Sequence, residues 1–254
     1  MNIALIACLF GGLVLVCWSW WFSARESAKE SAEVQERTSV MQSLIAEFRA
    51  AFDQEQIEMA AHMEKLRQAG HFAEATMLVD RLLREVTDHN SALYVHLLLM
   101  KMDCLLQQNQ IDQAETICDE YIQENVSKEQ KLTVLDGFAS HILYQSSAAY
   151  FARAEKFARM GLEYAPGTLT LKGTLGSLLV EQGNYAEGEA LLNECQERSL
   201  ALQDRAISCF YLGVIKMRIG STKEGKRLIN CAMKMYPEAW MVAKGKALVK
   251  AARK

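Results

Sequence analysis

The sequence predicts an all-α protein, an α-solenoid of about five helical hairpins, and two observations carry this prediction. A short phrase recurs along the chain, and its closing small residues, Ala75, Ala114, Ala154, Gly188 and Gly225, lie 39, 40, 34 and 37 positions apart. A near-constant period in this range indicates one supersecondary unit stacked several times rather than a single globular core. In addition, the 254 residues include only two prolines and no alternating β-branched runs, which favours helix nearly throughout.

A turn residue precedes most copies of the phrase. Gly70, Asn109, Gly183 and Gly220 lie two positions before the first residue of their copy, where a turn between helices needs a permissive backbone. The third copy differs, because residues 146–149 read Ser-Ser-Ala-Ala where this glycine would stand. We expect its link between helices to be longer than the others.

The last two repeats show the fullest pattern of small residues. Their marked positions are Leu175, Gly176, Gly183, Tyr185, Gly188 and Leu192 in one, and Leu212, Gly213, Gly220, Gly225, Ala232 and Pro237 in the next. A small residue midway along the first helix lets the second helix cross close to it, and a small residue early in the second helix receives that contact. Both prolines, Pro166 and Pro237, follow a second helix, which a proline would end.

These offsets resemble those of tetratricopeptide repeats, over residues 56–237. The resemblance is good for the three C-terminal repeats and degenerate for the first two. It implies a tetratricopeptide-like solenoid whose concave face, lined by the first helix of each hairpin, binds a partner protein or peptide.

An N-terminal transmembrane helix is predicted over residues 1–23. Residues 3–22 form an uncharged run of 20 residues, long enough to span a bilayer, and Trp18, Trp20 and Trp21 gather at its end, where interfacial aromatic residues are preferred. No Lys or Arg precedes the run, and bulky Phe22 stands close before the best small-residue cleavage site, so a retained anchor is favoured over a cleaved signal peptide or a lipoprotein signal.

The charges beside this run favour a cytoplasmic repeat domain. Arg25, Lys29 and Arg37 follow the run and no basic residue precedes it, and positive residues tend to stay inside. The seven cysteines are odd in number and form no CxxC pair, which agrees with a reducing compartment.

Residues 24–55 are predicted to continue as a juxtamembrane helix, because no glycine or proline interrupts them. An apolar stripe with helical period runs along this segment. Its members are Met41, Leu44, Ile45, Phe48, Ala51 and Phe52. The stripe either packs on the first repeat as a cap or pairs with a second copy, which would make a homodimer.

The C-terminal end, residues 238–254, is predicted to form a basic capping helix in which Trp240 covers the apolar end of the last repeat. Residues 216–254 hold eleven Lys or Arg against Glu224 and Glu238, so they carry about +9 and the rest of the chain about −12. The basic residues form either a solvated cap or a contact with an anionic surface. That contact would use Lys244, Lys246, Lys250, Arg253 and Lys254. Nucleic-acid binding is not expected, since Trp240 is the one aromatic residue beside them.

No catalytic or metal-binding pattern stands out. His62, His71, His89, His96 and His141 show no metal-ligand spacing, and the chain holds no P-loop, dinucleotide-binding or nucleophile-elbow motif. We therefore expect no cofactor, no metal and no enzymatic activity.

Binding is thus the expected function, and tetratricopeptide geometry implies which residues line the groove. They are His96, Leu99 and Asp103 in the second repeat, Thr170, Gly173, Ser177 and Glu181 in the fourth, and Ile207, Phe210, Val214 and Arg218 in the fifth. The Lys and Asn clamp that holds a terminal carboxylate in some family members is missing, so the groove is expected to take part of a folded protein or an amphipathic helix.

The sequence therefore predicts a non-catalytic, membrane-anchored scaffold or adaptor that recruits a partner protein. Two alternatives stay open. One is an envelope assembly factor of the same fold on the extracytoplasmic side, and the other is a structural protein that self-associates through residues 24–55.

Overall fold

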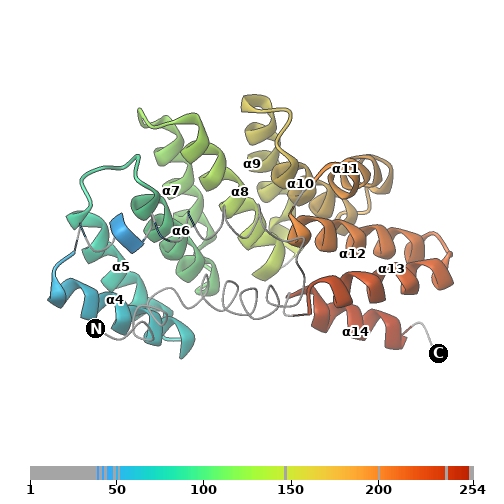
Figure 1. The fold of residues 1–254 in the computed structure, drawn as a ribbon, viewed down its shortest axis with the longest axis horizontal. Helices are drawn as coiled ribbons and strands as arrows, with labels where there is room; N and C mark the ends of the chain where they lie inside the picture. The colour runs from blue at the N-terminus through green and yellow to red at the C-terminus, as the bar shows by residue number, and fades with distance from the viewer. Residues whose placement is uncertain are drawn as a thin grey trace. The chain divides into compact units, whose positions relative to one another are not determined.

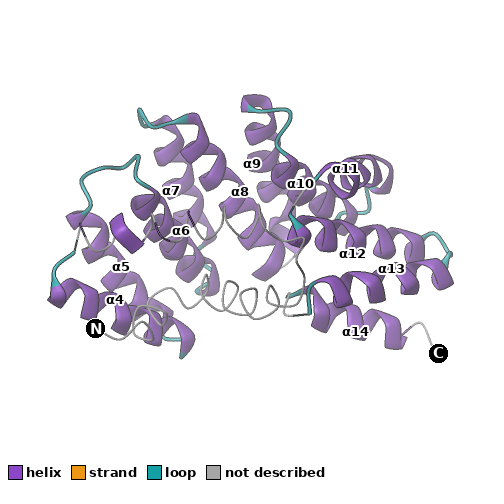
Figure 2. Ribbon diagram, viewed as in Figure 1, coloured by secondary structure: helices purple, strands orange, loops and turns teal. Residues whose placement is uncertain are grey.

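A computed structural model describes residues 39, 42, 45–47, 50, 52–145, 148–199, 201–237 and 240–251. Every regular element of these residues is helical, which confirms the all-α prediction for this part of the chain (Figures 1 and 2). The chain divides into two compact units, Met1–Val134 and Leu135–Lys254, which we call unit 1 and unit 2.

Unit 1 contains two helical hairpins. Its helices are α4 (Gln54–Gln68), α5 (Phe72–Glu85), α6 (Ala92–Gln107), α7 (Ile111–Gln123) and the first part of α8 (Lys128–Gln145). The two hairpins stack because α5 packs against both α4 and α6. The core between them includes Met63, Val79, Leu82 and Leu93, each at most 1% exposed.

Unit 2 continues with three hairpins and an end helix. Its elements are the rest of α8, the 3₁₀ turn η2 (Ala148–Tyr150), α9 (Phe151–Tyr164), α10 (Leu169–Glu181), α11 (Tyr185–Arg198), α12 (Leu202–Arg218), α13 (Thr222–Met235) and α14 (Met241–Ala251). Helix α10 contacts α9, α11 and α12, and every residue from Gly173 to Val180 is buried. The first helix of this hairpin is therefore enclosed on all sides.

The predicted turn residues adopt the left-handed backbone conformation. The φ angles are 82° at Gly70, 59° at Asn109, 87° at Gly183 and 92° at Gly220. After α4, the His71 amide donates to the Leu66 carbonyl at 2.8 Å and the Gly70 amide to the Arg67 carbonyl at 3.1 Å, the Schellman arrangement. Asn109 ends α6 in the same way, since asparagine tolerates this conformation better than most residues.

The predicted close helix crossings are present in unit 2. A Cβ atom added at Gly225 would lie 2.7 Å from the Gly213 carbonyl oxygen, and one at Gly188 would lie 3.0 Å from the Gly176 carbonyl oxygen. The two helices of each hairpin thus meet backbone to backbone, which a side chain at either position would prevent.

The third link is longer, as expected. Helix α8 ends at Gln145 and α9 begins at Phe151, whereas α10 ends at Glu181 and α11 begins at Tyr185. Part of the longer link forms η2.

The predicted anchor over residues 3–22 lies outside the described residues, as does most of the juxtamembrane segment 24–55. Among the residues that are described, no helix is both long and apolar enough to cross a bilayer. From the predicted apolar stripe, Ile45 and Phe52 pack against the core of unit 1. Between them, the Glu47 carboxylate accepts a hydrogen bond from the Leu93 amide at 3.1 Å.

Candidate functional site

Unit 1 holds three residues of the predicted groove, and one of them is engaged in a buried ion network. Asp103 is 6% exposed, and its carboxylate accepts a hydrogen bond from Arg67 Nη1 at 3.2 Å. Arg67 also donates to both carboxylate oxygens of the buried Glu64, at 2.8 and 2.9 Å. This network joins α4 to α6, so Asp103 serves packing in the structure.

His96 and Leu99 of the same helix are partly exposed. Burial, together with the nearby Arg67 cation, lowers the pKa of His96 to about 4. The imidazole is therefore neutral at physiological pH.

In unit 2 most of the predicted groove residues are buried. Ser177 and Phe210 have no exposed surface, and Ile207 and Val214 are each 7% exposed. Thr170 and Arg218 are exposed, and Glu181 is partly exposed. Of the groove residues predicted in unit 2, only Thr170, Glu181 and Arg218 are therefore exposed or partly exposed.

An aromatic cluster explains part of this burial. The Trp240 ring lies 4.6 Å from the Tyr144 ring and 6.3 Å from each of Phe210 and Tyr211, measured between centroids. Lys244 of α14 forms an ion pair with Glu181 of α10 and places its Nζ 5.6 Å from the Tyr211 ring. The C-terminal segment therefore covers Phe210 and Glu181.

The other predicted basic contacts divide into two groups. Lys246 and Lys250 are exposed on α14. Arg253 and Lys254 lie outside the described residues.

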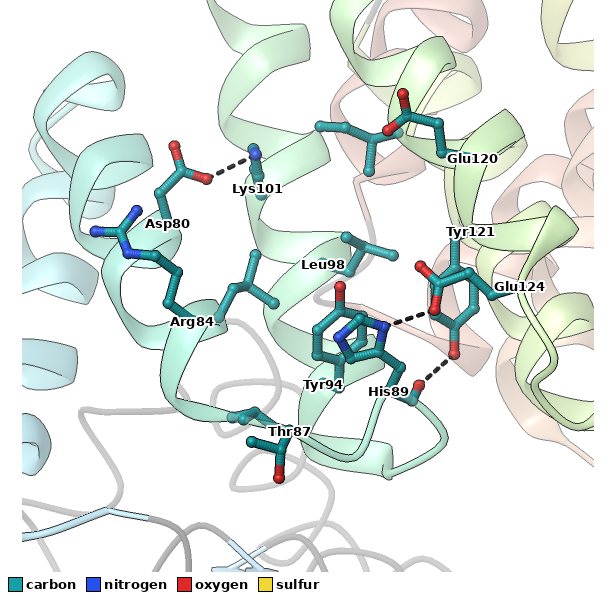
Figure 3. Close-up of a pocket in the computed structure, with 13 residues that line it drawn as sticks. Asp80, Arg84, Thr87, His89, Tyr94, Leu98, Lys101, Glu120, Tyr121 and Glu124 are labelled. Atoms are coloured by element: carbon teal, nitrogen blue, oxygen red, sulfur yellow. Dashed lines mark hydrogen bonds and ion pairs between the residues drawn. The ribbon is translucent and has the colours of Figure 1, made fainter.

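Unit 1 contains a cleft of about 570 Å³ that the sequence reasoning did not predict (Figure 3). Helices α5 and α7, the second helices of their hairpins, form its walls, and α6 forms its floor together with the loop that follows α5. Its lining residues are Asp80, Leu83, Arg84, Val86, Thr87, His89, Tyr94, Leu98, Lys101, Ile117, Glu120, Tyr121 and Glu124.

The two sides of the cleft carry opposite charges. The α5 side carries the exposed Arg84 and the Lys101 ammonium (Figure 3). Lys101 forms an ion pair with the Asp80 carboxylate at 2.6 Å. Exposed Glu120 and the Glu124 carboxylate lie on the α7 side. Between them the floor is aliphatic and aromatic.

Hydrogen bonds and ring contacts fix the α7 end of the cleft. His89 Nδ1 lies 2.6 Å from a Glu124 carboxylate oxygen, and the His89 ring stacks on Tyr94 with centroids 4.1 Å apart. The Tyr121 hydroxyl donates to the His89 carbonyl at 2.8 Å. Burial and the Glu124 carboxylate raise the pKa of both Tyr94 and Tyr121, so both phenols stay protonated.

The loop that carries His89 is held by hydrogen bonds where it meets α6. The Ser91 hydroxyl caps α6 by accepting from the Tyr94 amide at 3.1 Å. The Asn90 side chain accepts from the Ser127 amide at 2.7 Å, and the Gln130 side chain donates to the Asn90 carbonyl at 3.1 Å. The cleft is therefore formed before any partner arrives.

This arrangement suits binding. In the described ranges, no group of three or more His, Cys, Asp or Glu side chains could hold a metal ion. The cleft combines an apolar floor with charged groups of both signs at its edges, which is how a docking surface for a protein segment is built.

A helical pattern in the sequence could have pointed to the cleft. Glu120 and Tyr121 lie three and four residues after Ile117, and Glu124 lies three residues after Tyr121, so the four fall on one side of α7 and its C-terminal end. The sequence-based prediction placed binding on the first helix of each hairpin, so it did not include this face of α7, a second helix.

Comparison with known proteins gives one similar fold. A crystal structure of a tetratricopeptide repeat protein from Parabacteroides merdae matches 78% of this chain and 73% of its own, with 16% sequence identity and a TM-score of 0.48. No family model matches the chain, and no curated protein matches it. The hairpin architecture therefore rests on the turns and helix crossings described above.

Proposed function

We propose that this protein is a non-catalytic binding module whose unit 1 cleft takes a segment of a partner protein. The observation that carries the proposal is the cleft itself, an apolar floor between a cationic and an anionic edge on stacked helical hairpins. Repeat proteins of this kind bind partners on surfaces that several repeats build together.

The cleft favours one kind of segment. Leu98 on the floor and Ile117 on the α7 wall fit an aliphatic or aromatic side chain, Arg84 attracts a carboxylate on one side, and Glu120 attracts a basic residue on the other. Complementary charges of this kind determine orientation and partner choice more than raw affinity. The fixed loop lowers the entropy lost on binding, because few groups need to be ordered.

We further propose that residues 3–22 anchor the chain in a membrane with the hairpins in the cytoplasm. The uncharged run, its terminal tryptophans and the basic residues after it support this topology. An extracytoplasmic assembly factor is the competing arrangement. Ile45 and Phe52 pack on unit 1, which favours capping over self-association through residues 24–55.

A charge exchange across the cleft tests the proposed function. The double variant R84E/E120K keeps the net charge but exchanges one cation of the α5 edge and one anion of the α7 edge. We expect partner affinity to fall about tenfold or more, since residues 84 and 120 would then repel the partner charges that Arg84 and Glu120 attract. The matched control is K128E/E129K, which exchanges two exposed charges of unit 1 outside the cleft. Partners are first collected from cells by proximity labelling with a tag after Lys254, and each is then measured as a purified protein.

The expected result is a partner that binds the wild type and the control equally and R84E/E120K weakly. A partner that binds all three chains equally would place the interface elsewhere. The concave face of unit 1 is the second candidate, because His96 and Leu99 are partly exposed there. The variant H96A/L99A in the same measurement separates the two sites.

A further inference from the structure

One end of unit 2 brings together three segments that are separate in the sequence. The turn between α12 and α13, the beginning of α13 and the end of α14 lie on the same side (Figure 1). Helices α13 and α14 run side by side, since a Cβ atom added at Gly245 would lie 2.9 Å from Met233 Sδ and 3.1 Å from Ile229 Cγ2. The chain turns back after α13, so Lys250, beyond Gly245, lies towards the beginning of α13.

This end is strongly basic. Arg218, Lys223, Arg227 and Lys250 are all exposed there, and we call them, with Ile219, the basic end. Lys223 and Arg227 are four residues apart and share one face of α13. Over α13 and α14 the sequence holds one acidic residue, Glu224, and α14 holds none. Basic side chains therefore far outnumber acidic ones on α13 and α14.

An aliphatic side chain stands at the tip of the basic end. Ile219 is 57% exposed in the turn after α12, directly after Arg218 and directly before Gly220. An exposed aliphatic residue flanked by cations matches the bilayer interface, where headgroups attract the cations and the acyl boundary accepts the apolar side chain.

We propose that the basic end binds the surface of an anionic phospholipid bilayer. Its four cations contact headgroup phosphates and carboxylates, and Ile219 enters the acyl boundary. Nucleic acid is a poorer match, because an aliphatic tip adds nothing to phosphate binding and the basic end has no aromatic residue on which bases could stack. The proposal extends the proposed membrane anchor but stands on different residues.

Hydrogen exchange of the full chain in lipid nanodiscs tests this contact. Discs of phosphatidylcholine are compared with discs that also contain phosphatidylglycerol, and exchange is followed in peptides that cover the α12–α13 turn. We expect turn amides to exchange about tenfold more slowly in anionic discs, and the protection to disappear at high salt, because exposed charges are screened.

Variants of exposed residues, and of the partly exposed Lys131, identify the groups responsible. R218Q/K223Q/R227Q/K250Q should abolish the protection, while K65Q/K128Q/K131Q/R205Q, which removes the same charge elsewhere, should retain it. I219S should weaken the protection, and M77S, at an exposed apolar residue of unit 1, should not. Circular dichroism confirms that each variant is folded.

Three outcomes would overturn the proposal. They are equal exchange in both kinds of disc, protection that survives in the four-glutamine variant of the basic end, and protection by duplex DNA where anionic lipid gives none. A chain that both kinds of disc fail to retain would instead refute the anchor. The basic end is then tested by sedimentation with vesicles of the same two compositions. Binding to anionic vesicles that is lost in the four-glutamine variant supports the proposal, and absence of binding overturns it. Neither result depends on the cleft of unit 1.

Discussion

The two hairpins of unit 1 and the last two hairpins of unit 2 share their turns but differ where their helices cross. Seven residues before the left-handed turn residue, unit 1 has Met63 and Met102, whereas unit 2 has Gly176 and Gly213. Both methionines are at most 1% exposed. One fold is therefore built in two ways, with flexible side chains between the helices in unit 1 and direct backbone contact in unit 2.

This difference affects how closely the helices pack. The two helices within each glycine hairpin, α10–α11 and α12–α13, approach each other more closely than the two helices of α4–α5 or of α6–α7 do. Methionine fills irregular gaps and tolerates changes in its surroundings. The proposed binding cleft lies over α6, in the unit with the looser crossings.

The two units also differ in what stabilises carboxyl groups that are shielded from water. In unit 1, Glu64 and Asp103 share the Arg67 cation. In unit 2, the partly buried Asp136 accepts a hydrogen bond from the Thr174 hydroxyl at 2.8 Å, and the charged side chain that acts on its carboxyl is another acid, Asp204. Burial therefore raises the pKa of Asp136 to about 6.

Removing the cation of unit 1 should have the largest effect. Arg67→Leu leaves the buried Glu64 carboxylate without its cation, with Gln68 as a hydrogen-bond donor to it, and we expect a loss of about 3–5 kcal/mol in unfolding free energy. Urea unfolding followed by circular dichroism measures the loss, and hydrogen exchange assigns it to unit 1. The control R67L/E64L should recover part of it, and an unchanged stability in R67L would show that the network is not stabilising.

Replacing Asp136 of unit 2 with a neutral residue should stabilise the protein, in contrast to the loss expected for Arg67→Leu. The folded pKa of Asp136 lies above its ordinary value, so wild-type stability falls as pH rises from about 4 to about 6, where its carboxyl ionises. Asp136→Asn keeps an acceptor for Thr174 and avoids this loss. We expect a gain of about 3 kcal/mol at pH 8 and almost none at pH 4.

Unfolding free energies of the wild type and D136N at both pH values check this expectation. A gain of equal size at pH 4 and pH 8 would contradict it, because the benefit would then not come from ionisation.

Filling a crossing point of unit 2 should have a smaller effect. In Gly225→Ala the new methyl would lie 2.7 Å from the Gly213 oxygen and 2.9 Å from the Met217 amide nitrogen, so the helices must separate. We expect a loss of about 2 kcal/mol. Thermal and urea unfolding measure it, and Gly167→Ala, where a Cβ atom meets nothing within 4 Å, is the control. Equal stability of G225A and G167A would refute the backbone-contact account.

The turns should show the smallest difference. Asn109→Gly relieves the left-handed strain that unit 2 avoids with glycine, and we expect a gain of about 0.5 kcal/mol. Gly183→Ala introduces that strain and should lose about 1 kcal/mol. Both are read from urea midpoints, and a loss in N109G would mean that the Asn109 side chain stabilises its turn.

Local patterns in the sequence predicted the repeating features of the fold. Turn residues such as Asn109, close crossings such as Gly213 with Gly225, and the longer third link follow from backbone rules that act within one hairpin. The helical pattern of residues 117–124 is also local, and the sequence alone could have identified it as one face of a helix.

Other features depend on contacts between residues distant in the sequence. Phe210 is buried because Trp240 returns over it, and Glu181 is paired because Lys244 reaches back from α14. Neither contact has a fixed offset that a repeat pattern would reveal. The division into two units likewise falls within the continuous helix α8, where no turn marks it.

Site-specific photocrosslinking in cells tests the central claim, that unit 1 binds a partner protein through its cleft. A photoreactive amino acid at Thr87, on the rim of the cleft, is compared with one at Met77, exposed elsewhere on unit 1, and one at Thr170, from the predicted concave groove. The account predicts a defined crosslinked partner from Thr87 that is lost in R84E/E120K and retained in K128E/E129K. A partner that crosslinks from Thr170 and not from Thr87 would contradict it.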